Sequence, residues 1–358
     1  MKRLVRIYSA SVIALLLLSC RAPNAWPDWD DGAAWRTLTV RDIERLVAAG
    51  ADINARSSYG NLSAHEWTVL MSAAAAAGDG SVIRAMIEAG AAVNADENGV
   101  TALMVAAERN SEPEIVAALI EAGAEVDAAT ANGFTALMYA AGFNDNPSVI
   151  QTLLEAGADL RPENLLRKSA LMEAANWNGQ PAVIEALIRA GADVNGRNGF
   201  GETALTYAAF NAEPAVSEAL LNAGAEVNVR TAAGWTPLIR AAGMQTPDAA
   251  RTVAALLAAG ADVYARNDEG ETALMRAVVF NGDLATIRAL IDAGSELDAR
   301  NALGETALIA AARYVGNPAV IEALVEAGAD ETLRDDDGRT AWDYMGSSSG
   351  SPSTDAEG

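Results

Sequence analysis

The chain of 358 residues contains one cysteine, Cys20, and one histidine, His65. Most zinc sites and many nucleophilic active sites depend on these two residue types. A single copy of each excludes a cluster of histidine and cysteine ligands, and leaves His65 as the one residue able to serve a Ser–His relay. The phosphate-binding motif G-x-x-x-x-G-K-[ST] is also absent. We therefore predict a protein that is not an enzyme and that binds no metal or cofactor.

Basic and aromatic residues are scarce as well. Lysine and arginine number 25 against 48 acidic residues, giving a formal charge of −23, and aromatic residues make up 5% of the chain. Such a charge repels nucleic acid and anionic lipid heads, so we predict no nucleic-acid partner. It either suits a partner with a basic surface or keeps an extended protein in solution. The 51% of apolar residues, mainly alanine and leucine, exclude a disordered acidic chain and predict closely packed helices.

The first residues have the features of a signal peptide, residues 1–19. A basic start with Lys2, Arg3 and Arg6 precedes the apolar run 12–18. This run is shorter than the roughly 20 residues that span a bilayer as a helix. It ends in Leu-Leu-Ser-Cys at Cys20, which resembles the lipobox of bacterial lipoproteins, although Leu18 is larger than the residue usual at its position.

That resemblance implies a lipidated Cys20 as the mature N-terminus, followed by a linker over residues 20–28. The protein would then be a lipid-anchored membrane protein of the bacterial cell envelope, facing the periplasm or the cell exterior. Two alternatives are a plain secretory signal with an incidental cysteine and an uncleaved membrane anchor. We expect Trp26 and Trp29, next to the linker, to seal the N-terminal end of the fold.

One phrase recurs along the rest of the chain. The dipeptide Ala-Gly, followed by Ala or Ser, has its glycine at positions 50, 90, 123, 157, 191, 224, 260, 294 and 328. A period near 33–34 residues predicts stacked helix pairs, an all-α repeat solenoid. In one copy, Thr135 caps a first helix, Pro147 begins a second helix, and Gly157 ends it in a left-handed conformation. A short β-hairpin-like turn then leads to the next threonine.

These phrases resemble the ankyrin repeat family, whose hallmarks are Thr-Pro-Leu-His-x-Ala-Ala and Gly-Ala-Asp-Val-Asn. The matching residues include Thr236-Pro237-Leu238, Ala241-Ala242 and the complete Gly-Ala-Asp-Val-Asn from Gly191. The resemblance implies an ankyrin array over residues 29–345, with about eight full repeats and partial caps. Residues 346–358, rich in serine and glycine, are expected to be a disordered tail.

Most copies depart from the family's pattern at the histidine. We expect apolar packing in place of the family's inter-repeat histidine hydrogen bonds, because methionine or isoleucine occupies that position. These residues are Met104, Met138, Met172, Ile239, Met275 and Ile309.

The residues that change between copies are candidates for a contact surface. Invariant positions are constrained by stacking, whereas variable positions face solvent or a partner. Aromatic residues and arginines gather four and eight places after the N-cap residue of the first helix, on one helix face. In ankyrin proteins such positions line the concave groove and the hairpin tips. The resemblance therefore implies a partner-binding set of Phe134, Tyr139, Phe143, Glu173, Trp177, Tyr207, Trp235, Arg240, Met244, Arg276, Phe280 and Tyr314.

The predicted function is a non-enzymatic protein–protein interaction scaffold, monomeric, which binds an unidentified protein. An inhibitor or immunity protein for one enzyme or toxin is an alternative. So is a structural spacer, in which the variable aromatic residues pack between repeats and alanine in their place changes only stability.

Overall fold

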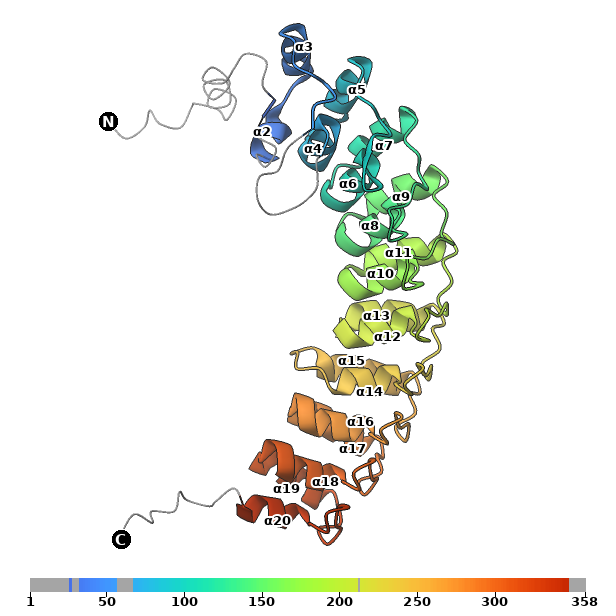
Figure 1. Cartoon of the computed structure of the whole chain (residues 1–358). Coiled ribbons are helices and arrows are strands. Elements are labelled where there is room, and N and C mark those ends of the chain that lie inside the picture. Colours follow the sequence, from blue (N-terminus) through green and yellow to red (C-terminus); the bar gives the residue numbers. More distant parts are fainter. Residues whose placement is uncertain (1–25, 28–31, 57–66, 212, 348–358) are drawn as a thin grey trace, which may run out of the picture. The chain divides into compact units, whose positions relative to one another are not determined.

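The computed structural model describes residues 26–27, 32–56, 67–211 and 213–347 (Figure 1). Cys20, Trp29 and His65 lie outside these residues, and so do the predicted signal peptide and the tail after Ser347. The chain forms two compact units, unit 1 up to Ala192 and unit 2 from Asp193. Each unit is built from successive helix pairs, so the fold is an all-α repeat solenoid.

Unit 1 contains five helix pairs and one small hairpin among its described residues. The first helices of the pairs are α2 (Gly32–Thr37), α4 (Val69–Ala76), α6 (Ala102–Arg109), α8 (Ala136–Phe143) and α10 (Ala170–Trp177). The second helices are α3 (Val40–Ala48), α5 (Gly80–Glu88), α7 (Pro113–Glu121), α9 (Pro147–Glu155) and α11 (Pro181–Arg189). Strands β1 (Asp96–Glu97) and β2 (Val100–Thr101) pair antiparallel in the turn before α6.

Unit 2 contains four helix pairs and a final single helix among its described residues. The first helices are α12 (Ala204–Asn211), α14 (Pro237–Ala242), α16 (Ala273–Arg276), α18 (Ala307–Ala310) and the single α20 (Ala341–Ser347). The second helices are α13 (Pro214–Asn222), α15 (Ala249–Ala258), α17 (Leu284–Asp292) and α19 (Pro318–Glu326). Helices α16 and α18 continue as the π-helical segments η1 (Ala277–Asn281) and η2 (Ala311–Val315). Helix α20 extends two residues into the segment predicted as a disordered tail.

The local sequence explains where these helices begin and end. The Thr135 hydroxyl accepts a hydrogen bond from the Met138 amide, which satisfies one of the unpaired N–H groups at the start of α8. Asn146 caps α9 in the same way, with Pro147 at the first helical position. Gly157 follows α9 with a φ of 86°, a left-handed conformation that costs a residue with a Cβ more than it costs glycine. All three predictions are confirmed.

Within each unit the helices form two layers. In unit 1, α4, α6, α8 and α10 contact one another in succession, and α5, α7, α9 and α11 form the second row. In unit 2, α12, α14, α16 and α18 form one row and α13, α15, α17 and α19 the other. The layers enclose an apolar core, and the residues that replace the family's histidine lie in it, each at most 3% exposed: Met104, Met138, Met172, Ile239, Met275 and Ile309. The expected apolar packing at this position is therefore confirmed.

In unit 1, buried asparagines join the ends of neighbouring first helices. The Nδ2 of Asn144 donates to the carbonyls of Ala107 and Asn110, each at 2.9 Å, in the repeat before it. Asn110 donates to Ala74 and Ala77 in the same manner, and Asn178 donates to the Asn144 carbonyl at 2.8 Å. Carbonyls at a helix C-terminus have no partner within the helix, so these amides satisfy groups that stacking would otherwise bury unpaired.

A second set of side chains joins the loops that follow the second helices. Asn54 accepts from the Ala92 amide and donates to the Gly90 carbonyl, and Asn94 makes the matching bonds with Glu125 and Gly123. In unit 2, Asn195 repeats the pattern with Glu226 and Gly224. Where asparagine ends the phrase that matches Gly-Ala-Asp-Val-Asn, its side chain therefore bonds one repeat to the next.

Two stacked tryptophans, Trp26 and Trp35, close the N-terminal end of unit 1. Trp26 is buried, its ring stacks on that of Trp35 with centroids 6.4 Å apart, and its indole N–H donates to the Asp52 carbonyl at 2.9 Å. The predicted sealing role is confirmed for Trp26. None of the helices in the described part of the chain is long and apolar enough to cross a membrane.

Candidate interaction surface

Two of the exposed predicted partner-binding residues are aromatic residues of unit 1 that contact each other. Phe143 ends α8 and Trp177 ends α10, and their side chains are 46% and 62% exposed. Their rings stack with centroids 6.2 Å apart and planes 30° apart. The next residue in each case is one of the buried asparagines, Asn144 or Asn178. The bonds of these asparagines hold the helix ends, so the two rings are presented from an ordered backbone. We refer to Phe143 and Trp177 as the aromatic pair.

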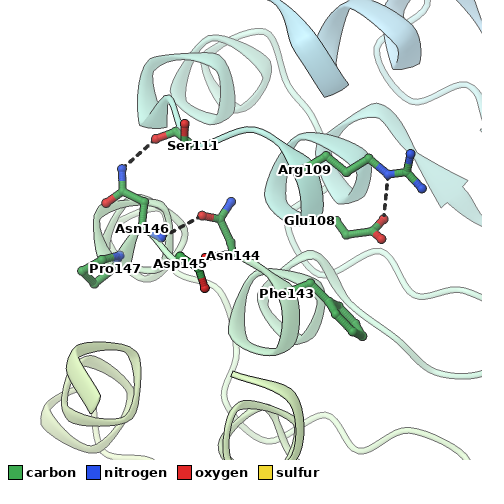
Figure 2. A pocket seen from close by; sticks show the side chains of 8 residues that line it. All are labelled: Glu108, Arg109, Ser111, Phe143, Asn144, Asp145, Asn146 and Pro147. Carbon is green, nitrogen blue, oxygen red and sulfur yellow. Dashed lines mark hydrogen bonds and ion pairs between the residues drawn. The ribbon is translucent and has the colours of Figure 1, made fainter. Parts of the chain in front are cut away.

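A pocket of about 430 Å³ adjoins the pair on the side of Phe143. Figure 2 shows its lining, which comes from the ends of α6 and α8 and the start of α9: Glu108, Arg109, Ser111, Phe143, Asn144, Asp145, Asn146 and Pro147. Six of its eight lining residues are polar or charged, and Asn146 donates a hydrogen bond to the Ser111 carbonyl at 2.7 Å. Arg109 lies 3.5 Å from Glu108 and also over the Trp67 ring. A smaller pocket of about 210 Å³ shares Glu108 and Arg109 and includes Tyr139.

Phe134 and Tyr139 pack against each other beside this second pocket. Their ring centroids are 5.3 Å apart, and both side chains are only partly exposed. Burial, together with the charge of Glu108, raises the pKa of Tyr139 above its usual value, so its hydroxyl stays protonated at neutral pH. Phe134 and Tyr139 therefore pack against each other and expose only part of their rings to solvent.

Glu173 is buried, so the expectation that its side chain is exposed on the contact surface is wrong. Its side chain is 1% exposed and its Oε1 accepts a hydrogen bond from Asn164 at 2.7 Å. In three repeats of unit 2, the matching asparagine bonds a glutamate four residues later in the turn: Asn198 to Glu202, Asn267 to Glu271 and Asn301 to Glu305. Lys168 occupies that turn position here, so the carboxylate comes from α10 instead.

The buried position of Glu173 affects its ionisation. Burial raises the pKa of its carboxyl above the usual range, an effect that the charge of Lys168 and the side-chain hydrogen bonds of Asn164 and Trp177 only partly offset. Its second oxygen, Oε2, has no hydrogen bond within the described residues. A buried carboxylate with one unpaired oxygen is costly to keep ionised.

In unit 2 most of the predicted residues contact other side chains of the same unit. Tyr207 donates to Glu202 at 2.5 Å, and Glu202 also accepts from Arg240 at 2.6 Å. The Arg240 guanidinium lies 5.6 Å from the Trp235 ring centroid and 5.9 Å from that of Phe210. These residues come from two neighbouring repeats, so their contacts join α12 to the turn and helix of the next repeat.

The same kind of contact continues through the next repeats. Arg276 lies 3.7 Å from the Phe280 ring centroid and 4.8 Å from that of Trp235, and 3.5 Å from the Glu271 carboxylate. Met244, after the end of α14, is half-buried. Tyr314 donates to the buried Glu305, which also pairs with Arg313 at 2.7 Å. Phe280 and Tyr314 remain 40% and 50% exposed, so they still offer part of their rings to solvent.

The sequence interpretation missed several exposed apolar residues. Phe210 is 46% exposed but comes seven places after Thr203 rather than eight, because this repeat is one residue shorter before its Pro214. A further group lies at the turn tips, two places after an asparagine that bonds their backbone N–H: Leu166, Phe200 and Leu303. They are 52%, 57% and 54% exposed. The recurring pattern Asn-x-apolar was the signal for them.

Comparison with known families agrees with this architecture. Family models described as ankyrin repeats match residues 33–130, 171–267 and 248–335, and a single-repeat model matches residues 132–164. The chain belongs to the ankyrin repeat family. Ankyrin repeats generally serve as non-enzymatic modules that bind other proteins, and the exposed aromatic pair is a surface suited to that role. None of the curated proteins compared matches this ankyrin chain. Its described residues contain no group of three or more His, Cys, Asp or Glu side chains placed to hold a metal.

The raised pKa of Glu173 predicts an unusual pH dependence for this ankyrin protein. A carboxyl whose pKa is higher in the folded state stabilises the fold at low pH and loses that contribution as the pH rises through the folded-state pKa. The stability of the natural protein relative to Glu173→Gln should therefore fall as the pH rises from the acidic range through the usual glutamate pKa of 4.5 and above it. Urea unfolding of both proteins across this range measures the difference.

Asp159→Asn is a control for which we expect the opposite dependence of stability on pH. Hydrogen bonds from the Arg161 side chain and backbone lower the pKa of Asp159 to about 2. The stability of the natural protein relative to Asp159→Asn should therefore rise with pH over the acidic range. If the Glu173→Gln difference also rises with pH, the account of a destabilised buried carboxylate is wrong.

Proposed function

We propose that this ankyrin protein is a non-enzymatic scaffold of the bacterial cell envelope that binds a partner protein through the aromatic pair of unit 1. The observation that carries the proposal is the exposure of Phe143 and Trp177, 46% and 62%, in a chain with few aromatic residues. Large aromatic side chains are enriched at protein interfaces, where they supply contact area at little entropic cost. The rings are presented on a backbone that buried asparagine bonds hold in place.

The contrast with unit 2 supports this choice. There, the aromatic residues at matching positions are covered in part by the chain's own arginines, Arg240, Arg276 and Arg313. In unit 1 no arginine of the described residues lies over Phe143 or Trp177. The two rings therefore keep an apolar surface that an internal packing role does not require.

The charge of the chain indicates a partner with a basic surface. The formal charge is −23, and Glu108 and Asp145 line the pocket beside Phe143. Opposite charges on two proteins raise the rate of association and disfavour acidic competitors.

The envelope location rests on the first twenty residues. The basic start, the short apolar run and the sequence Leu-Leu-Ser-Cys favour a lipoprotein signal with Cys20 as the lipidated residue. Bacterial lipoproteins of this type carry more than one acyl chain, which gives the stable anchoring that a single chain does not. The array would then act on the aqueous side of a membrane.

A capture experiment tests the binding role. Residues 21–358 are immobilised and exposed to a detergent extract of the source cell's envelope, beside the double variant Phe143→Ala/Trp177→Ala. Tyr264→Ala, which removes a 61% exposed ring elsewhere, is the matched control. We expect the natural chain and Tyr264→Ala to retain one protein in similar amounts. The double variant should retain at least tenfold less of it, because interface residues of this kind each contribute more than about 1.4 kcal/mol to the binding free energy. Equal retention by all three baits contradicts the proposal and favours a structural spacer.

Membrane anchoring is tested separately at Cys20. Cells expressing the full chain or Cys20→Ser are labelled with a radioactive fatty acid and then fractionated. We expect label and membrane association with the natural chain, and neither label nor membrane association after the substitution. A natural chain that carries no label would leave a plain secretory signal as the better interpretation.

A further inference from the structure

Unit 2 shows how this fold holds a guanidinium group. Arg240 lies over the Trp235 and Phe210 rings while bonding Glu202 at 2.6 Å. Arg276 lies over the Trp235 and Phe280 rings and 3.5 Å from Glu271. In both cases the planar cation lies over aromatic rings and close to a carboxylate. Guanidinium groups suit such sites because they stack on rings and pair with carboxylates at once.

A third arginine repeats the arrangement at the end of unit 2. Arg313 lies 5.2 Å from the ring centroids of both Tyr314 and Tyr344, and 2.7 Å from Glu305. Glu305 is 1% exposed and also accepts a hydrogen bond from the Tyr314 hydroxyl, so this carboxylate is buried next to an aromatic side chain. Three neighbouring repeats thus combine the same three components: an arginine, aromatic rings and a carboxylate.

Unit 1 contains two of these components without the third. Trp177 comes eight places after its N-cap residue, as Phe280 does, and Phe143 belongs to the repeat before it, as Phe210 precedes Arg240. Glu173 occupies the sequence position of Arg240 and Arg276, four places after the N-cap residue. The repeat therefore has a carboxylate where its relatives in unit 2 have the cation. Arg109, the pocket residue, lies instead over Trp67 and beside Glu108.

The carboxylate of this repeat lies next to the aromatic pair. A Cβ placed on Gly142 would lie 3.8 Å from Trp177 Cδ1 and 3.9 Å from Glu173 Cβ, so both side chains meet over the backbone beside Phe143. Glu173 is 1% exposed, and its Oε2 has no hydrogen bond within the described residues. An unpaired buried carboxylate oxygen favours a cation nearby, because a positive charge offsets the cost of its desolvation.

We propose that the aromatic pair and Glu173 form a docking site for an arginine side chain of the partner protein. The guanidinium stacks on the exposed rings of Phe143 and Trp177, and the negative charge of Glu173 beside them favours a cation at that place. The partner thereby supplies in unit 1 what Arg240 and Arg276 supply within unit 2. This inference rests on the proposed binding function and specifies the chemistry of the residue bound.

A titration followed by nuclear magnetic resonance tests the site directly. The probe is acetyl-Gly-Arg-Gly-amide, and its neutral control replaces arginine with citrulline, which has nearly the same shape and no charge. The readout is the indole N–H signal of Trp177 in the full chain, identified by its loss in Trp177→Phe. We expect a saturable shift with the arginine peptide and at least fivefold weaker binding of the citrulline peptide. A lysine peptide should bind at least twofold more weakly than the arginine peptide, since an ammonium does not stack on rings as a guanidinium does.

Substitutions separate the two parts of the site. Glu173→Gln keeps an oxygen for the Asn164 hydrogen bond while removing the charge, and should weaken the arginine peptide at least threefold without changing the citrulline peptide. Phe143→Ala should weaken the arginine peptide at least threefold, whereas Tyr264→Ala should leave its binding unchanged. No saturable shift, equal binding of the arginine and citrulline peptides, or unchanged binding by Glu173→Gln overturns the proposal.

The outcome is distinguishable from failure of the scaffold function. If an envelope protein is lost from the Phe143→Ala/Trp177→Ala bait but the arginine and citrulline peptides bind alike, the binding role stands and the arginine site is rejected. If the arginine peptide binds selectively and no envelope protein is captured through the pair, the site stands and the proposed scaffold function is rejected.

Discussion

The presentation of the candidate surface depends on the side-chain amides that join the ends of the first helices. Asn144 donates to two carbonyls of the preceding repeat, and Asn178 continues the series. These carbonyls have no partner within their helices, and stacking removes them from water. The amide bonds therefore offset the free-energy cost of burying the carbonyls when the repeats stack closely. Phe143 and Trp177 directly precede these asparagines. The bond that closes each helix end therefore also holds the backbone of the exposed aromatic residue beside it.

The two units use the same helix face in different ways. In unit 2, arginines at this face bond carboxylates and cover rings of neighbouring repeats, as Arg240 does with Glu202 and Trp235. In unit 1, the equivalent place holds Glu173, and the rings of the aromatic pair stay exposed. A solenoid tolerates this variation because each repeat contacts only its neighbours, so one repeat can be specialised without disturbing distant ones.

The sequence predicted the parts of the structure that local chemistry decides. Thr135, Pro147 and Gly157 mark helix ends because caps, a missing N–H and a left-handed φ depend on adjacent residues alone. The environment of the variable residues depends on contacts between repeats. Glu173 is buried and bonds Asn164 in a repeat whose turn holds Lys168 instead of glutamate, and Arg240 bonds Glu202 from 38 residues away. The buried asparagines follow a sequence pattern, since each comes nine places after its N-cap residue. The pattern did not show that their side-chain amides bond the previous repeat.

Hydrogen exchange in Asn144→Ala tests this account most directly. The substitution leaves the carbonyls of Ala107 and Asn110 without their amide donor in a buried place, at a cost of about 2 kcal/mol. Amides of α8 should then exchange about 30-fold faster than in the natural protein. Asn132→Ala, which changes an exposed asparagine in the preceding turn, should alter exchange less than about threefold. If the amides of α8 exchange at the same rate in the two variants, the asparagine bonds do not hold the repeats together and other contacts position the aromatic pair.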